Sequence, residues 1–193
     1  MRVKNFFPTA WHLNRIEMEN LKTNERFLFH CGRWLSKRDG DKQIIRELPA
    51  QGPGINKPLP VIKYHVDLYT GSRRGAGTDA NVFINIFDDI GDTGEYSSTN
   101  KNKFERKNVD KFVIEAVSLK QIKKIRIGHD GTGPDAGWFL DKVVVRPEDI
   151  HYEEATFICN QWLVTDEDDG LIVRELSLGF AGQPLDKTTY NVT

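Results

Sequence analysis

Residues 138–176 decide the fold, because the chain contains this stretch twice. The stretch begins with WFLDKV (138–143), continues with FIC (157–159) and WL (162–163), and ends with REL (174–176). The same order appears near the N-terminus, as Trp11, FHC (29–31), WL (34–35) and REL (46–48). The two tryptophans Trp11 and Trp138 are 127 residues apart (138 − 11), and the REL triplets are 128 apart (174 − 46). A period this long indicates whole domains in series, since solenoid repeats recur at about 20–50 residues.

The region between the two copies reads as a run of short strands. Apolar residues recur at every second position in residues 62–68, 112–116 and 125–127, which is the period of a strand. Residues 82–87 are apolar on both faces, which suggests a strand covered on two sides. The spacing predicts eight strands between Ile62 and Leu176, with a bulge near Asp141 and Lys142 where the alternation changes phase. No stretch of ten residues has a helical period. The sequence therefore predicts an all-β fold, an eight-stranded antiparallel β-sandwich.

The repeat also predicts the domain boundaries. Residues 1–50 match only the C-terminal part of a unit, with strands expected at 11–18, 26–35 and 43–48. About 40 residues of β structure rarely fold alone, so we expect residues 1–50 to be poorly ordered alone or to lean on the complete unit. Residues 51–60 (QGPGINKPLP) read as a linker and 61–177 as the complete unit. Residues 178–193 read as a linker and the start of a further unit.

Composition limits the partners and the compartment. The 193 residues carry a net charge of −1, so no overall field attracts nucleic acid. Cys31 and Cys159 occupy equivalent repeat positions, so we expect both to be small buried side chains and not a disulfide. Free thiols favour a reducing compartment. Because no apolar run approaches about 20 residues and Met1 opens no signal peptide, we expect a cytoplasmic location.

Two further sets of residues recur in both copies. The tryptophan pairs, Trp11 with Trp138 and Trp34 with Trp162, are expected to be core anchors, because a tryptophan at a strand entry usually packs. The Arg-Glu dipeptides at 46–47 and 174–175 are expected to form structural ion pairs.

The strand order predicts where the loops gather. If successive strands reverse direction, loops 71–80, 100–110, 129–137 and 164–170 share one end of the sandwich. Function concentrates in loops on a rigid scaffold, so this end is the candidate surface. Its glycine-rich and acidic loops suit calcium, which takes 6–8 oxygen ligands in irregular geometry. The alternative for these acidic residues is that they cap turns through their own backbone.

Catalytic motifs do not explain these loops. GSRRGAGTD (71–79) leads into a strand and lacks the helix N-terminus of a phosphate loop. The sequence has no GxSxG elbow, and no HxxxH or CxxC that would suggest zinc. The sequence therefore favours a non-enzyme with no small-molecule substrate.

Four motifs resemble the PLAT domain, the β-sandwich shared by polycystins, lipoxygenases and bacterial α-toxins. They are GAGTDANV (75–82), FERKNVDKFVIEA (104–116), IRIGHDGTGPDAGWFLDKV (125–143) and DDGLIVREL (168–176). The resemblance covers residues 62–176 in full and 11–48 as a truncated repeat. It implies a module that attaches proteins to a membrane lipid surface or to a membrane or cytoskeletal protein. The similarity to members built of many PLAT units implies the plasma membrane of hair-cell stereocilia and a role in hearing.

The resemblance also implies candidate site residues. The candidate calcium ligands, Ca²⁺ being the one cofactor considered, are Gly77, Thr78, Asp79, Asn102, Asp135 and Ala136. Two departures from the family pattern are Gly75, where an acidic ligand occurs, and lysines 101 and 103 in the middle loop. The candidate lipid or partner contacts are Arg73, Arg74, Lys101, Lys103, Arg106 and Lys107. Each can add about 1 kcal/mol of attraction to an anionic leaflet, and the alternative is that they are solvated loop residues.

Two other functions remain open at this point. The unit could be a purely protein-binding scaffold with no lipid contact. It could also be a regulatory β-sandwich fragment of a lipoxygenase-like or lipase-like enzyme whose catalytic domain lies outside these 193 residues.

Overall fold

The computed structural model describes residues 10–89, 91–98, 103–148 and 153–178. The chain divides into two compact units, and the boundary lies between Val61 and Ile62, although Glu115–Ser118 group with the first unit. The described residues contain strands and no α-helix, hence no helix that could cross a membrane.

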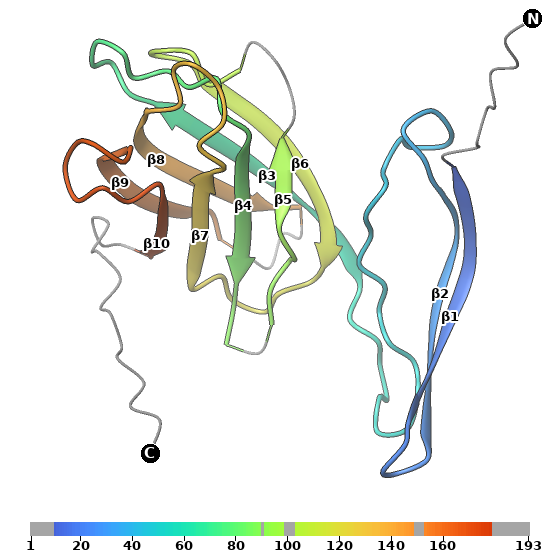
Figure 1. Ribbon diagram of the computed structural model, residues 1–193. Coiled ribbons are helices and arrows are strands. Elements are labelled where there is room, and N and C mark those ends of the chain that lie inside the picture. Colours follow the sequence, from blue (N-terminus) through green and yellow to red (C-terminus); the bar gives the residue numbers. More distant parts are fainter. Residues whose placement is uncertain (1–9, 90, 99–102, 149–152, 179–193) are drawn as a thin grey trace, which may run out of the picture. The chain divides into compact units, whose positions relative to one another are not determined.

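The second unit is a sandwich of two four-stranded sheets (Figure 1). One sheet has the order β10-β7-β4-β5, and the other has the order β6-β3-β8-β9. The strands are β3 (Val61–Thr70), β4 (Val82–Phe87), β5 (Tyr96–Ser98), β6 (Val109–Val117), β7 (Lys124–His129), β8 (Trp138–Pro147), β9 (Ala155–Leu163) and β10 (Val173–Ser177). The pairs β10–β7, β3–β8, β4–β5, β4–β7 and β8–β9 are antiparallel. The predicted eight-stranded antiparallel sandwich is confirmed.

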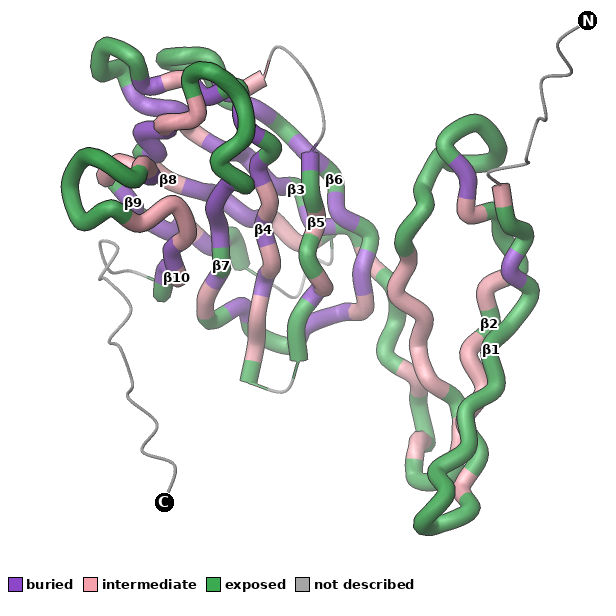
Figure 2. The backbone as a smooth tube through the Cα atoms, in the orientation of Figure 1, coloured by how far each residue is buried: buried purple, intermediate pink, exposed green. Residues whose placement is uncertain are grey.

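The core lies between the sheets and follows from the alternation in the sequence. Figure 2 shows buried residues along the strands and exposed residues in the connecting loops. The inward side chains of β4 and β7 include four isoleucines, and those of β3, β8 and β9 include Val66, Leu68, Val143 and Phe157, all almost fully buried. Each such side chain contributes about 1.5–3 kcal/mol of hydrophobic free energy.

The predicted bulge in β8 is present. Tyr69 of β3 lies opposite Lys142 and Thr70 lies opposite Leu140, so Asp141 is the extra residue of β8 in its pairing with β3. The shift returns the apolar residues of the second half of β8 to the face used by Trp138 and Leu140. The single strand can therefore bury both of its apolar segments.

The first unit contains a hairpin that reproduces the β8–β9 hairpin. It consists of β1 (Trp11–Asn20) and β2 (Glu25–Leu35). Trp11 lies opposite Leu35 as Trp138 lies opposite Leu163, and both second strands have a bulge at the same position, where Gly32 and Asn160 have positive φ. The edge-to-face ring pairs also correspond, His12–Trp34 at 5.1 Å and Phe139–Trp162 at 5.3 Å. The repeat in sequence is thus a repeat in local geometry.

The arginines of both REL triplets form ion pairs, but with other partners than expected. Arg174 donates to both carboxylate oxygens of Asp169, at 2.8 and 2.6 Å, and Arg46 pairs with Asp41, the equivalent residue. The expected Arg174–Glu175 pair is wrong, because successive residues of a strand point to opposite faces. Glu175 instead accepts a hydrogen bond from Lys124. The Arg174 guanidinium lowers the pKa of Asp169 below its usual value.

Three expectations for the first unit are corrected. Residues 43–48 form no strand, because β10, their counterpart, pairs with β7, and the described part of the first unit has no equivalent of β7. Trp11 is 60% exposed and Trp34 44% exposed, whereas Trp138 is fully buried. Without a second sheet over the hairpin, the same residue types are left at the surface. Trp162 is half-buried.

The two cysteines are free thiols. Cys159 is buried in the core, and Cys31 is half-buried in the hairpin. Burial raises the pKa of the Cys159 thiol to about 11, so this cysteine is a small core residue and not a reactive thiolate.

The two equivalent tryptophans give a matched test of the core. Trp138→Phe removes the indole N–H that donates to Thr70 and leaves a small cavity, so it should lower the free energy of unfolding by about 2 kcal/mol. Trp11→Phe should change it by less than about 0.5 kcal/mol, because Trp11 is exposed. Urea denaturation followed by circular dichroism measures both; equal effects would contradict the assignment of the core.

The Asp169–Arg174 pair gives a pH-dependent test. Asp169→Ala leaves the fully buried Arg174 without its carboxylate and should cost about 3 kcal/mol at pH 7. The folded pKa of Asp169 is lowered, so this stability is present above the unfolded value of about 4. This stability is lost as the pH falls through the folded pKa of Asp169, so the free energies of unfolding of the variant and the parent become similar there. Asp166→Ala, in the same loop, is the control and should be neutral by thermal melting.

Candidate functional site

Four loops of the second unit meet at one end of the sandwich (Figure 1). The Asp79 N–H donates to the Asp135 carbonyl at 3.0 Å, and the Thr78 hydroxyl donates to the Ala136 carbonyl at 2.9 Å. The Thr78 N–H donates to the Phe104 carbonyl at 3.2 Å. The predicted gathering of the loops at one end is therefore confirmed. We call this surface, formed by loops 71–80, 103–108, 129–137 and 164–170, the loop end.

Trp138 is buried directly beneath the loop end and contacts residues next to each of its loops. Its indole N–H donates to the Thr70 hydroxyl at 3.0 Å, at the end of β3. Its ring lies 5.5 Å from that of Phe104, edge to face, and it pairs across the sheet with Leu163. One buried side chain thus contacts elements next to all four loops.

Phe104 anchors the basic loop, a role that the sequence prediction missed. It is almost fully buried and has φ +62°, and its N–H donates to the Asp110 carboxylate at 2.9 Å. Its backbone packs so close to Gly77 that a Cβ there would lie 3.1 Å from the Phe104 carbonyl oxygen. The sequence did contain a signal for this role, because Phe104 is the one aromatic residue in the charged stretch KNKFERK (101–107).

Loop 129–137 is fixed by its own polar groups. His129 is buried; its Nδ1 accepts from the Gly131 N–H at 3.1 Å, so its Nε2–H donates to the Leu163 carbonyl at 2.8 Å. The Asp130 carboxylate accepts from the side chains of Asn81 and Thr132, each at 2.7 Å. These hydrogen bonds hold the pKa of Asp130 far below its usual value. Asp130 therefore serves the loop structure.

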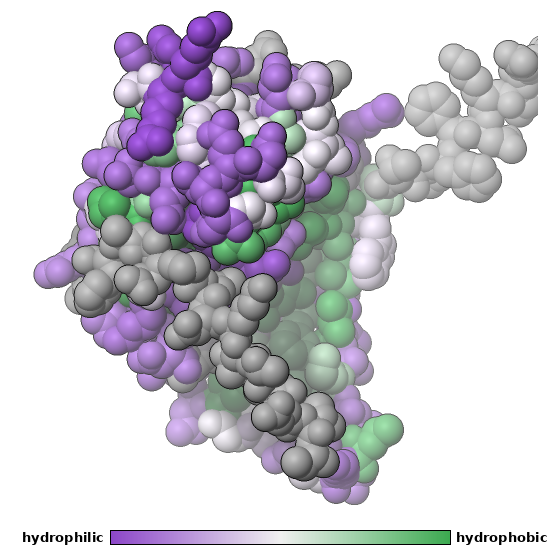
Figure 3. Space-filling view, turned by 60° about the vertical axis from the view of Figure 1, so that its left-hand side comes forward, coloured by the Kyte–Doolittle hydropathy of each residue, from purple (hydrophilic) through white to green (hydrophobic). Residues whose placement is uncertain are grey.

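A pocket of about 650 Å³ lies among the four loops. Six predicted residues line it: Arg74, Gly77, Thr78, Asp79, Arg106 and Asp135. Residues that the prediction did not include also line it, among them Glu105, Trp162, Val164 and Glu167. Figure 3 shows mostly hydrophilic residues over much of the visible surface of this unit. The pocket combines guanidinium groups with carboxylates.

The described residues fit a calcium site only in part. Asp79 and Asp135 are adjacent and supply two carboxylates, but the Thr78 hydroxyl and the Ala136 carbonyl bond to each other. Within the described ranges, no three His, Cys, Asp or Glu side chains are grouped closely enough to hold a metal ion. Asn102 lies outside the described residues. The placed oxygen ligands are fewer than the 6–8 that calcium takes.

The predicted basic residues do not form one patch. Arg74, Arg106 and Lys107 are exposed at the loop end. The Arg73 guanidinium lies over the Phe139 ring at 4.1 Å, and the Lys103 ammonium lies over the Phe112 ring at 4.2 Å. Lys101 lies outside the described residues.

Comparisons with known proteins agree with this architecture. Residues 64–175 match the family model described as PLAT/LH2 domain. Lipoxygenase homology domain-containing protein 1 of Homo sapiens is 40% identical over 190 residues, covering 96% of this chain and 9% of that protein. Polycystin-1-like protein 1 of Homo sapiens is 36% identical over 118 residues, covering 59% of this chain and 4% of that protein. The chain spans less than a tenth of either relative.

Among solved structures, coral 8R-lipoxygenase is similar, with a TM-score of 0.52 and 27% identity over 61% of this chain and 17% of that chain. That lipoxygenase is activated by calcium via a C2-like domain. The family model covers more than half of the chain, and the fold and the gathered loops agree with it. The chain belongs to the PLAT/LH2 domain family.

Proposed function

We propose that this chain is a non-catalytic PLAT binding module, one unit of a tandem array, that attaches its parent protein to the plasma membrane through the loop end. The observation that carries the proposal is the fixing of four polar loops at one end of a rigid sandwich. The repeat within the chain supports the tandem arrangement, and we extend the proposal to stereocilia on the resemblance of the sequence motifs.

The pocket chemistry supports binding over catalysis. Its described lining offers carboxylates and guanidinium groups but no serine, cysteine or histidine. A nucleophile with an adjacent base is what covalent catalysis requires. The charged groups can instead bind headgroups or a partner surface.

The distribution of charge decides how the loop end can meet an anionic membrane. Arg74, Arg106 and Lys107 attract anionic lipid, but carboxylates of the two acidic loops lie beside them. Within about 8 Å, the screening length at physiological salt, such carboxylates offset the attraction. A cation that neutralised Asp79 and Asp135 would therefore strengthen membrane binding. We include calcium as a modulator of the same surface on this ground.

Liposome sedimentation tests the membrane contact. The parent chain should bind anionic vesicles more than neutral ones, and binding should fall as salt rises. Arg74→Glu/Arg106→Glu/Lys107→Glu should reduce binding at least about tenfold, because it removes three cations at about 1 kcal/mol each. Lys120→Glu/Lys123→Glu, which changes two lysines outside the loop end, is the control. Equal binding of the parent to neutral and anionic vesicles would overturn the membrane proposal and leave a protein-binding module.

Titration calorimetry of the 193-residue chain tests calcium. We expect heat on addition of calcium and a rise in melting temperature, since a ligand that binds only the folded state stabilises it. Asp79→Asn/Asp135→Asn should abolish both effects, whereas Asp92→Asn, in the turn between β4 and β5, should leave them unchanged. No heat and unchanged melting of the parent would exclude calcium.

A further inference from the structure

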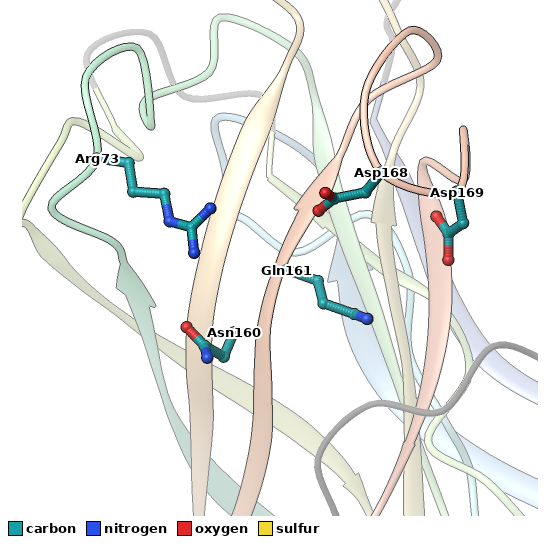
Figure 4. Close-up of a pocket in the computed structure, with 5 residues that line it drawn as sticks. All are labelled: Arg73, Asn160, Gln161, Asp168 and Asp169. Atoms are coloured by element: carbon teal, nitrogen blue, oxygen red, sulfur yellow. The ribbon is translucent and has the colours of Figure 1, made fainter.

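A second pocket, of about 460 Å³, lies beside β9 (Figure 4). Its lining comes from three segments: Arg73 from loop 71–80, Asn160 and Gln161 from β9, and Asp168 and Asp169 from loop 164–170. Figure 4 shows the Arg73 guanidinium and the Asp168 carboxylate pointing toward each other across the pocket. Neither group forms an ion pair that the structure records among the described residues.

The lining contains hydrogen-bonding capacity that the protein does not use. The Gln161 Oε1 atom is buried and has no hydrogen-bond partner among the described residues. Asp168 accepts one bond, from the Trp162 N–H to its Oδ2 at 3.1 Å. A buried acceptor without a donor lowers the stability of the folded state, so a ligand that donates there regains that free energy.

The repeat within the chain shows which side chain the first hairpin has at the position of Gln161. Residue 33 of β2 corresponds to Gln161 of β9, and Asp41 corresponds to Asp169 (161 − 33 = 128; 169 − 41 = 128). In the first hairpin this residue is Arg33, and its Nη1 lies 3.6 Å from the Asp41 carboxylate. The same local geometry therefore holds a guanidinium beside the carboxylate. Gln161 is shorter and neutral, and the second hairpin supplies no guanidinium from that position.

We propose that this pocket binds an arginine side chain of a partner protein. The guanidinium of the partner pairs with the Asp168 carboxylate, because both carboxylate oxygens of Asp169 already accept from Arg174. It donates to the Gln161 amide oxygen as well, once that side chain turns toward the pocket. The four ionised side chains here, Arg73, Asp168, Asp169 and Arg174, sum to zero charge. A carboxylate next to the arginine in the partner therefore pairs with Arg73, which Phe139 holds in place.

The proposal goes beyond membrane attachment, because it names a protein ligand and a pocket separate from the one among the loops. A peptide titration tests it, with the 15N-labelled 193-residue chain and the capped peptide acetyl-Arg-Gly-Glu-amide as the probe. We expect saturable amide shifts in Asn160, Gln161 and Asp168, with a Kd of about 1 mM for so small a ligand. The citrulline peptide, which is nearly the same shape but uncharged, should bind at least about tenfold more weakly.

Two conservative variants identify the acceptors. Gln161→Leu removes the amide oxygen and Asp168→Asn removes the charge while keeping an acceptor for the Trp162 N–H. Each should weaken peptide binding at least about fivefold, and Gln161→Leu, which lies in β9 outside the loop end, should leave vesicle binding unchanged. Asp166→Asn, in the same loop but outside the pocket lining, is the matched control. No saturable shift, equal shifts with citrulline, or unchanged binding in both variants would overturn the proposal, whatever the vesicles show.

Discussion

The contacts of Trp138 are the constraint on which the loop end depends. This residue closes loop 129–137, hydrogen-bonds to Thr70 where β3 ends, and packs on Phe104 inside the basic loop. Its strand partner Leu163 ends β9, immediately before loop 164–170. The loops are polar and cannot form a core of their own. Their relative positions are therefore set by one buried indole and the strand ends around it.

Comparing the two copies of the repeat shows which structural features depend only on nearby residues and which depend on the packing of the whole sandwich. The β1–β2 hairpin has the strand register, the bulge, the edge-to-face ring pair and the Arg–Asp pair of the β8–β9 region. These features are encoded within about 40 residues, because they require only neighbours on the same hairpin and loop. Burial of the tryptophans is not local. Trp138 is buried in the sandwich, where it packs on Phe104, and Trp11 is exposed, although the two tryptophans occupy equivalent positions of the repeat.

The charges at the loop end show what linear patterns hide. In the sequence, loops 71–80 and 100–110 read as a basic patch and loops 129–137 and 164–170 as an acidic one. Folding places the two sets around one pocket, so their fields largely cancel. It also splits the neighbouring residues Arg73 and Arg74 between two different pockets. Each pocket therefore favours a ligand that carries both signs of charge, or a cation together with an anion.

The sequence by itself determined the number of strands in the sandwich, the bulge at Asp141 and the end of the sandwich at which the loops gather. These follow from side-chain alternation and from the reversal of antiparallel strands, which are properties of residues near one another in the chain. Only the tertiary structure decided that Trp138 and Phe104 are buried and that their rings pack on each other. This contact joins β8 to the basic loop, two segments far apart in the chain, and it exists only when the strands around them come together. The Arg174–Asp169 pair, in contrast, is local, because Arg46 and Asp41 form the same pair in the first unit.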